Sequence, residues 1–525
     1  MADAQHISLT IEGRTVSVPA GTSILEAAKT AGVLVPHYCY HPGLPVAGVC
    51  RMCLVEVEKA PKLAPACATA VAEGQVVHVH SDKALEARKG VLEFLLLNHP
   101  LDCPICDQAG ECELQDYTYR EGRASGRSHE PKRFNPAEDF GGDVLYVTNR
   151  CILCTRCVRF MDDVAHDPVL NVSERGDRAV IGKFEGKDLT HPWAANVIDL
   201  CPVGALVSKD FLNKARAWEL DRTPSVCPNC TQGCNTILET RDNVVVRMRP
   251  RSNENVNHYY LCDKGRLDYR WLNRTDRIEA PLVRRGERLV ATGWDDALRA
   301  AALHLNGRRA FVLASPMLSN ESLWTLSRLM ERSGGAGAFR VARGEEAPLA
   351  AVPDLALRAE RAANVRAAEL FGFTRSDTTL DGLRDGDVLV IADHELTAAD
   401  APALARAHAV IVIGTTLPDA AAQAIVALPS TNVAEEDGTF TSLRDRVQQY
   451  RQAKAAPGMA RPVWWSVGDL LVFLGERAGY FVASEAFDAL AAARPEFAGL
   501  SYDVLGLKGR VLAGSAQPAG AGGER

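Results

Sequence analysis

The sequence predicts a multidomain protein of mixed α+β and α/β class, with small cysteine-bearing modules ahead of a doubly wound α/β domain. Three observations support this fold class. The chain has 525 residues, which is enough for several domains. All 15 cysteines lie before residue 263. From about residue 278, short apolar runs alternate with Ala- and Leu-rich helical stretches, as expected for parallel strands joined by helices.

The cysteines fall into four groups, and none is left over. Only one group has fewer than four thiols, and that group has a histidine close by. The groups are Cys39, Cys50, Cys53 and Cys67; His99, Cys103, Cys106 and Cys112; Cys151, Cys154, Cys157 and Cys201; and Cys227, Cys230, Cys234 and Cys262. Thiolates select zinc or iron–sulfur clusters, and imidazole tolerates either. We therefore predict four metal centres held by these side chains.

The composition excludes two classes of partner. The net charge is −7 and Lys and Arg are scattered, so nucleic-acid binding has no electrostatic footprint. No apolar run reaches the roughly 18 residues that suggest a membrane span, so membrane contact is expected only through partner proteins. The chain begins MADAQHISLT, without the basic start and apolar core of a signal peptide. We therefore expect the protein to be in the cytoplasm, where cysteine thiols stay reduced.

Residues 1–80 are expected to form a β-grasp domain. Residues 6–20 alternate apolar and polar side chains around Glu12-Gly13, which predicts a hairpin. Thr22 is placed to cap a helix over SILEAAKTA that ends at Gly32. The first cysteine group then follows in the order long gap, CxxC, long gap, Cys. This order resembles a plant-type 2Fe–2S ferredoxin, although the first gap is ten residues rather than four.

Residues 81–120 are expected to form a helical module around the second group. A helix over residues 82–98 should place one apolar face on the core, and Pro100 should end it and aim His99 at the three thiols. The predicted face comprises Leu85, Val91, Leu92, Leu95 and Leu96. A 4Fe–4S cluster is favoured here over a structural zinc ion. If His99 is not a ligand, Asp102 and Asp107 are the nearest alternatives.

Residues 121–222 resemble a two-cluster bacterial ferredoxin that has lost one cluster. Residues 113–142 are polar and Gly-rich and are expected to be a surface connection. The ferredoxin template needs C-x2-C-x2-C-x3-C-P twice, with the fourth cysteine of each run binding the other cluster. Here one complete ligand set survives. The positions of the other cluster are occupied by Met161, His191, Ala194 and Val197, so His191 is not expected to be a ligand.

Residues 223–277 carry the fourth group, with a short hairpin expected around Arg241-Asp242. Taken alone this group fits a zinc ribbon as well as a 4Fe–4S cluster, and its neighbours favour the cluster. Residues 278–510 are expected to form the α/β domain, and residues 511–525 a flexible tail. The strands of the α/β domain should cover 309–315, 387–393 and 409–415. None of these strands is followed by the GxGxxG motif of a dinucleotide site.

As a set, these motifs resemble the large iron–sulfur subunit of proton-translocating NADH–quinone oxidoreductase, respiratory complex I (the 75-kDa subunit in mitochondria). The stretches that carry the resemblance are HPLDCPICDQAGEC, CILCTRC, CPNCTQGC, LCDKGR and ALPSTNVAEEDGTFTSLRDRVQ at 427–448. The resemblance covers nearly the whole chain. It implies one 2Fe–2S cluster and three 4Fe–4S clusters on the four groups, and no catalytic residues, because the clusters carry electrons without acid–base chemistry.

The resemblance also implies partners and a location. Electrons from NADH would pass through FMN on a flavoprotein subunit, along the clusters of this chain, and through further iron–sulfur subunits to quinone. The fourth 4Fe–4S centre would lie off that path, and the complex would be at the cytoplasmic side of the bacterial inner membrane. The region from 278 resembles a molybdopterin oxidoreductase but has no cysteine to bind molybdenum. We expect a vestigial scaffold without that cofactor.

Three alternatives remain open from the sequence. A formate dehydrogenase chain would need a molybdenum ligand and a longer C-terminal region. An iron-only hydrogenase would need further cysteines after residue 263, and the matching subunit of an NAD-linked hydrogenase resembles residues 1–220 only. A zinc-rich scaffold without a redox role would be colourless, whereas an iron–sulfur protein is brown.

Overall fold

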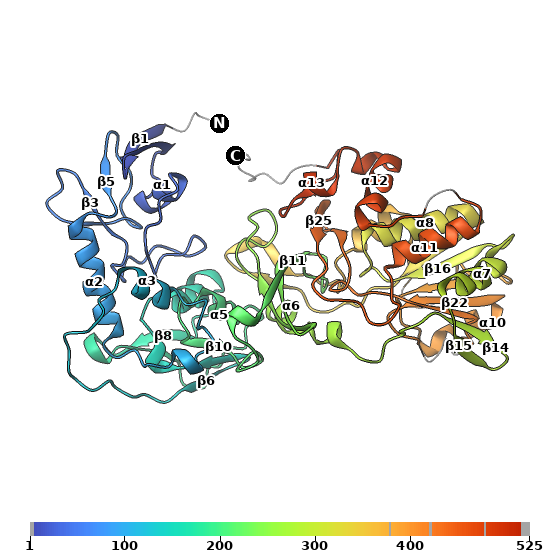
Figure 1. The fold of residues 1–525 in the computed structure, drawn as a ribbon, viewed down its shortest axis with the longest axis horizontal. Coiled ribbons are helices and arrows are strands. Elements are labelled where there is room, and N and C mark those ends of the chain that lie inside the picture. Colours follow the sequence, from blue (N-terminus) through green and yellow to red (C-terminus); the bar gives the residue numbers. More distant parts are fainter. Residues whose placement is uncertain (1–4, 377–379, 419–422, 477–478, 516–525) are drawn as a thin grey trace. The chain divides into compact units, whose positions relative to one another are not determined.

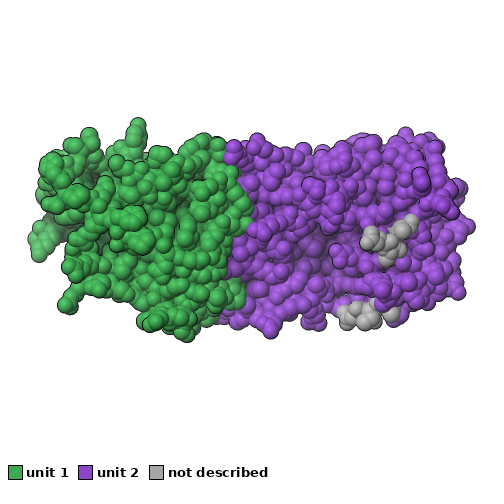
Figure 2. Space-filling model, turned by 90° about the horizontal axis from the view of Figure 1, so that it is seen from below, with its two compact units in different colours: residues 1–220, 349–352 green, residues 221–348, 353–525 purple. Residues whose placement is uncertain are grey.

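In the computed structural model the chain folds into two compact units (Figure 2). Each unit has its own hydrophobic core. Unit 1 comprises Met1–Leu220 and Leu349–Val352, and unit 2 comprises Asp221–Pro348 and Pro353–Arg525. The described residues are 5–376, 380–418, 423–476 and 479–515. None of the helices in these ranges has the length and apolar character needed to cross a membrane. The fourth cysteine group shares unit 2 with the α/β region.

Unit 1 begins with a five-stranded sheet against which one helix packs (Figure 1). Its strand order is β2-β1-β5-β3-β4, with β1 and β5 parallel. The elements are β1 (His6–Ile11), β2 (Arg14–Pro19), α1 (Ile24–Thr30), β3 (Leu54–Val57), β4 (Ala64–Pro65) and β5 (Val76–His78). The predicted hairpin is confirmed: Glu12 and Gly13 both have positive φ, as a tight two-residue turn requires. This is the order of elements of a β-grasp fold.

The cap of α1 was predicted one residue too early. The hydroxyl oxygen of Ser23 accepts a hydrogen bond from the Glu26 N–H at 3.3 Å, which satisfies an otherwise unpaired donor of the first turn. The Thr22 hydroxyl instead donates to the Pro19 carbonyl at 2.7 Å. Thr22 therefore closes the preceding turn and Ser23 caps the helix.

The second module consists of α2 (Asp82–Leu96), a short 3-10 turn (Cys103–Ile105) and α3 (Glu113–Glu121). The predicted apolar face of α2 is confirmed only in part: Leu92 is fully buried, and the other four predicted residues are half-buried. The remaining fully buried residues of the helix are Ala84 and Arg88. Arg88 is buried because its guanidinium pairs with Glu121 of α3 at 2.9 Å. The region 113–142 was predicted as a connection throughout, and it begins with this amphipathic helix.

The third module contains two short helices and two small sheets. One sheet has three strands in the order β10-β7-β6, and the other is the β8–β9 hairpin. The elements are β6 (Glu138–Gly141), β7 (Val144–Tyr146), α4 (Arg156–Arg159), β8 (Leu170–Ser173), β9 (Val180–Lys183), α5 (Asn196–Leu200) and β10 (Leu206–Ser208). Met161, Ala194 and Val197 are each at most 1% exposed. Three of the four positions assigned to a lost cluster are thus part of the apolar core.

Unit 2 begins with the antiparallel sheet β11 (Asp221–Val226), β12 (Asn235–Arg241) and β13 (Val244–Pro250), followed by α6 (Asp263–Leu267). The β12–β13 hairpin was predicted, but it turns one residue later than expected. Asp242 and Asn243 have positive φ, a conformation that these two residue types tolerate better than most.

The rest of unit 2 is organised around an eight-stranded sheet with the order β15-β14-β23-β22-β21-β16-β17-β20 (Figure 1). The six strands from β23 to β20 are parallel. Its strands are β14 (Leu282–Arg285), β15 (Arg288–Ala291), β16 (Ala310–Ala314), β17 (Ala336–Phe339), β20 (Thr374–Arg375), β21 (Val388–Ala392), β22 (Ala409–Gly414) and β23 (Val426–Pro429). From β16 the chain winds to one edge and then returns through β21, which confirms the doubly wound prediction.

Helices cover both faces of this sheet. Val312 of β16 packs in a core with α7 (Trp294–Leu305), α8 (Asn320–Ser333) and α11 (Val463–Phe473). Phe311 and Leu313 point to the other face, in a core with α10 (Ala401–Arg406). Alternate residues of a buried strand therefore supply two separate cores, which explains its continuous apolar sequence.

The end of the chain was predicted as a flexible tail from residue 511. Val511 instead belongs to β26 (Arg510–Val511), which pairs with β25 (Arg446–Tyr450) beside β24 (Gly438–Thr441). The Ser515 hydroxyl donates to Asp445 at 2.9 Å. The remaining part of the predicted tail, 516–525, lies outside the described residues.

Candidate metal centres

The first ligand set lies in the loop between α1 and β3 and in the loop that follows β4. Its thiols are in mutual contact: the Cys39 N–H donates to Cys50 Sγ at 3.4 Å, and the Cys53 and Cys67 sulfurs are also 3.4 Å apart. Hydrogen bonds from the Cys50 and Cys67 thiols lower the pKa of Cys39, and the backbone N–H groups of Cys50 and Val49 lower it further. Backbone donors aimed at a sulfur stabilise a thiolate, which is the form that binds metal.

The second ligand set lies between α2 and α3. Cys106 and Cys112 are buried and Cys103 is exposed. Burial lowers the pKa of His99 to about 4, which keeps the imidazole neutral as a ligand requires. Its Nδ1 atom is buried and has no hydrogen-bond partner among the residues that the structure describes. A buried nitrogen without a partner, in a segment that also carries three cysteines, fits a metal ligand.

The two alternative ligands in this set are engaged elsewhere. Asp102 accepts a hydrogen bond from Arg150 Nε at 3.0 Å. Asp107 accepts one from the Asn213 N–H at 3.1 Å. Neither carboxylate is left without a partner as His99 Nδ1 is, so the geometry favours the histidine.

The third ligand set surrounds a cavity. Cys151, Cys154, Cys157 and Cys201 all line it, together with apolar side chains such as Ile152 and Val203. Leu153 and Thr155 adopt positive φ, which is uncommon for such residues, in the loop between the cysteines. The Leu153 N–H donates to Cys151 Sγ at 3.4 Å. The strained loop thus turns a backbone donor towards a sulfur.

The fourth ligand set lies in unit 2, and all four of its thiols are buried. The Cys227 N–H donates to the Cys234 carbonyl at 2.8 Å, and the Gly265 N–H donates to Cys262 Sγ at 3.3 Å. A Cβ at Gly265 would lie 3.3 Å from both Cys227 Sγ and Cys262 Sγ. Gly265 therefore closes the site on one side with minimal bulk.

Most of these thiols are too buried to ionise without a compensating charge. Burial raises the pKa of Cys112, Cys151 and Cys201 to about 11, and that of Cys154 and Cys262 to about 12. Metal binding supplies the positive charge and displaces the thiol protons. No three His, Cys, Asp or Glu side chains of the described residues are arranged around a single metal ion.

Direct contacts join the first three sets within unit 1. The Glu113 N–H donates to the Pro202 carbonyl at 3.1 Å, and these residues directly follow Cys112 and Cys201. Arg159 Nη2 donates to the carbonyls of Cys39 and Cys154, at 2.6 and 3.2 Å. The loops of the second and third sets thus share a backbone hydrogen bond, and those of the first and third sets share a guanidinium.

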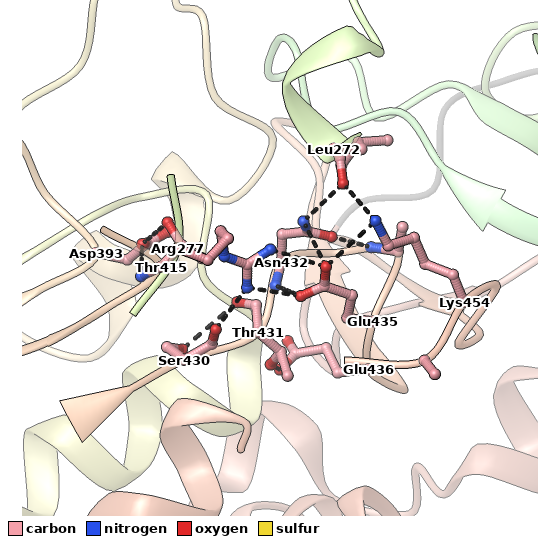
Figure 3. Close-up of polar contacts among 12 residues, drawn as sticks. Leu272, Arg277, Asp393, Thr415, Ser430, Thr431, Asn432, Glu435, Glu436 and Lys454 are labelled. Carbon is pink, nitrogen blue, oxygen red and sulfur yellow. Dashed lines mark hydrogen bonds and ion pairs between the residues drawn. The ribbon is translucent and has the colours of Figure 1, made fainter. Parts of the chain in front are cut away.

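In unit 2, the carboxyl ends of three neighbouring strands are occupied by the chain's own polar groups (Figure 3). Asp393, directly after β21, accepts hydrogen bonds from the N–H and the hydroxyl of Thr415, at 2.9 and 2.8 Å. Thr415 directly follows β22. After β23, the Ser430 carbonyl accepts a hydrogen bond from Arg277 Nη2 at 2.7 Å.

The same network contains a buried ion pair. The side chains of Arg277 and Glu435 are 2% and 0% exposed, and they pair at 2.8 Å (Figure 3). Lys454 lies 3.5 Å from the same carboxylate and donates to the Leu272 carbonyl at 2.8 Å. A buried carboxylate needs such partners because an unpaired one is strongly destabilising.

Five family models match the chain, and the first four each enclose one complete ligand set. Their descriptions are 2Fe-2S iron-sulfur cluster binding domain (4–82), NADH-ubiquinone oxidoreductase-G iron-sulfur binding region (88–127), NADH-quinone oxidoreductase subunit 3, ferredoxin-like domain (141–207), molybdopterin oxidoreductase Fe4S4 domain (220–274) and molybdopterin oxidoreductase (361–472). The chain therefore contains domains of the 2Fe–2S and 4Fe–4S binding kinds.

Three curated relatives carry the names of subunits of NADH-ubiquinone or NADH-quinone oxidoreductase. The mitochondrial NADH-ubiquinone oxidoreductase 78 kDa subunit of Candida albicans is 39% identical over 74% of this chain and 52% of its own. That of Neurospora crassa is 45% identical over 63% and 45%. The G subunit of NADH-quinone oxidoreductase from Rickettsia bellii is 40% identical over 62% and 48%. The chain thus spans about half the length of the relatives it matches.

A solved structure titled as an NAD+-reducing [NiFe]-hydrogenase in the H2-reduced state also matches. It is 28% identical and covers 40% of this chain and 90% of its own, with a TM-score of 0.37.

Several residues of these sites were not found from the sequence. Arg159, Gly265 and the Pro202 carbonyl contact ligands or ligand loops from other parts of the chain. The spacing of the cysteines gives the ligands themselves, because each run is local. A signal that could have found Arg159 is the pair of arginines within CILCTRCVR, since a cation beside buried thiolates has an electrostatic reason to be there.

Proposed function

The chain is a homologue of the large iron–sulfur subunits of NADH–quinone oxidoreductase, and we propose that it carries electrons within that complex. The proposal is supported by the four complete ligand sets inside iron–sulfur family regions. The observation that carries it is the chain of contacts between three of these sets in unit 1. A structural metalloprotein has no need to place its metal sites in contact, whereas an electron carrier does.

The four sets would hold one 2Fe–2S and three 4Fe–4S clusters. The first set would bind the 2Fe–2S cluster, and His99 would be the one ligand that is not a thiolate. Each cluster, when bound, takes up and releases one electron. The chain's own residues supply the rest: backbone N–H groups aimed at Cys39, Cys151 and Cys262 stabilise their thiolates, and burial excludes water.

The contacts support an order of transfer from the first set to the third and then to the second. The Arg159 guanidinium lies between the loops of Cys39 and Cys154. The Glu113–Pro202 hydrogen bond then connects the peptide after Cys201 with the peptide after Cys112. Cys103 is the one ligand of these three sets that is exposed, so the second set is placed to pass electrons to a partner protein.

The region after residue 277 would be a scaffold without a molybdenum cofactor. Ligands of open α/β sheets bind outside the carboxyl ends of the strands. Here those ends carry the network of Asp393, Thr415 and Arg277 with its buried ion pair. The fourth set is tied to this scaffold, because the Arg358 backbone N–H faces Cys230 and Arg358 Nε donates to Gln232 at 2.8 Å.

The partners would be the FMN-containing, NADH-binding subunit and the iron–sulfur subunits that lead to quinone. The complex would lie at the cytoplasmic side of the bacterial inner membrane, with this chain bound to it through other subunits. The isolated chain would therefore not catalyse the complete reaction from NADH to quinone.

The test is reduction by NADH with and without the flavoprotein partner. NADH alone should leave the visible absorbance of the anaerobically purified chain unchanged, and dithionite should bleach it. Adding the flavoprotein subunit should allow NADH to bleach the clusters. Rapid bleaching by NADH without a partner, or none with the partner present, would contradict the proposal.

A further inference from the structure

Arg156 lies inside the third ligand set, between Cys154 and Cys157 at the start of α4. It is 4% exposed. Its Nη1 atom donates to the Leu200 carbonyl at 3.1 Å, and Leu200 directly precedes Cys201. One guanidinium therefore connects both halves of the third set, which are separated by 44 residues along the chain.

The other nitrogen of the same guanidinium reaches the neighbours of two more sets. Arg156 Nη2 donates to the Tyr40 carbonyl at 2.7 Å, and Tyr40 directly follows Cys39 of the first set. It also lies 3.5 Å from a carboxylate oxygen of Glu113, which directly follows Cys112 of the second set. Arg156 thus contacts a chain neighbour of a ligand in each of three sets.

We propose that Arg156 is a positioning residue shared by three centres, which fixes their ligand loops against one another and raises their reduction potentials together. The inference rests on the proposed cluster content. A guanidinium keeps its charge at every working pH. A buried positive charge is weakly screened and favours the state with one more electron, so its loss should lower all three potentials.

Arg159 provides a matched control one turn along the chain. Its hydrogen bonds in the described part of the chain go to Cys39, Pro45, Cys154 and Thr155. These residues belong to the loops of the first and third sets and not to the second. Arg159→Gln should therefore lower two potentials and leave that of the second centre unchanged.

The experiment is an EPR-monitored redox titration of the assembled complex with native chain, Arg156→Gln, Arg156→Lys and Arg159→Gln. In Arg156→Gln, the reduced-to-oxidised ratio of all three centres at a fixed potential should fall about tenfold, which is about 59 mV for one electron. The fourth centre should be unchanged and serves as an internal reference. Arg156→Lys keeps the charge and should stay within about threefold of the native ratio.

The outcomes separate this inference from the proposed function. If the native chain lacks iron and EPR signals, the proposed function fails. If Arg156→Gln keeps its iron but the second centre keeps its native midpoint, the shared role of Arg156 is overturned. If Arg156→Gln does not assemble, Arg156→Lys decides. Native midpoints in Arg156→Lys support the charge role, and a reduced-to-oxidised ratio about tenfold below native at a fixed potential contradicts it.

Discussion

Gly204 leaves room for the thiol of Cys106, because a side-chain carbon at residue 204 would overlap the Cys106 sulfur. Gly204 lies in the loop after Cys201 of the third set, whereas Cys106 belongs to the second. Gly204→Ala should therefore displace Cys106 and cause selective loss of the second cluster. We expect about four fewer iron atoms per chain and loss of one EPR signal, measured on the purified protein.

The control for this substitution is Gly90→Ala. A Cβ at Gly90 meets nothing within 4 Å, and the residue lies in α2. Alanine should stabilise the helix by about 1 kcal/mol and leave the iron content native. Equal iron content in the two variants would show that the contact with Cys106 is not needed for the cluster.

His99 should ligate the second cluster and set its potential. A neutral imidazole in place of a thiolate leaves the site one charge less negative, which favours the reduced state. His99→Cys should keep the cluster and lower its midpoint, whereas His99→Ala should give a labile or three-iron cluster. EPR-monitored titration of the assembled complex measures both. Unchanged spectra and midpoints in His99→Ala would show that His99 is not a ligand.

The fourth ligand set should matter for assembly more than for electron flow. It lies with the α/β region in unit 2, and metal-ligand energy is folding energy where no site exists in the unfolded chain. Cys227→Ala should reduce the amount of assembled complex but leave turnover per complex nearly native. Cys201→Ala, in the third set, should reduce turnover per complex as well. A large loss of turnover in fully assembled Cys227→Ala would place the fourth centre on the electron path.

The local parts of the fold were predictable and the long-range contacts were not. The hairpin at Glu12-Gly13 and the buried strands have patterns that repeat over a few residues. Arg88 was not predicted as a core residue, because its partner Glu121 lies 33 residues away. A charged side chain is assigned to the surface unless its partner is known.

In the candidate sites, too, the local features were predictable from the sequence and the long-range contacts were not. Cysteine spacing indicates which thiols act together, since ligands of one set lie in short runs. The contacts between sets leave no such pattern: Arg159 and Cys39 are 120 residues apart. The sequence therefore predicts the metal centres as separate sites, and only the fold brings three of them into contact.

Unit 2 should become less stable as pH rises, because it contains buried carboxyl groups. Burial raises the pKa of Glu321 to about 7 and that of Glu436 to about 8, above the roughly 4.3 of an unfolded chain. Folded protein therefore binds more protons than unfolded protein. The stabilisation is complete below about pH 4.3 and is lost as pH rises to about 8.

Glu436→Gln should remove its share of this pH dependence. The Thr431 and Tyr450 hydroxyls that contact Glu436, at 2.7 and 2.8 Å, can also bond an amide. Thermal unfolding of the full chain between pH 5 and 8 should show a growing advantage of the variant. The expected slope is at most about 1.4 kcal/mol per pH unit. Asp437→Asn, at an exposed neighbour, should keep the native slope, and parallel curves for native chain and Glu436→Gln would contradict the prediction.

The most direct test of the account is the metal content of the anaerobically purified chain by mass spectrometry. One 2Fe–2S and three 4Fe–4S clusters predict about 14 iron atoms per chain, with little zinc and no molybdenum. About four zinc ions and no iron would contradict the electron-transfer role. One molybdenum per chain would contradict the scaffold role of the α/β region.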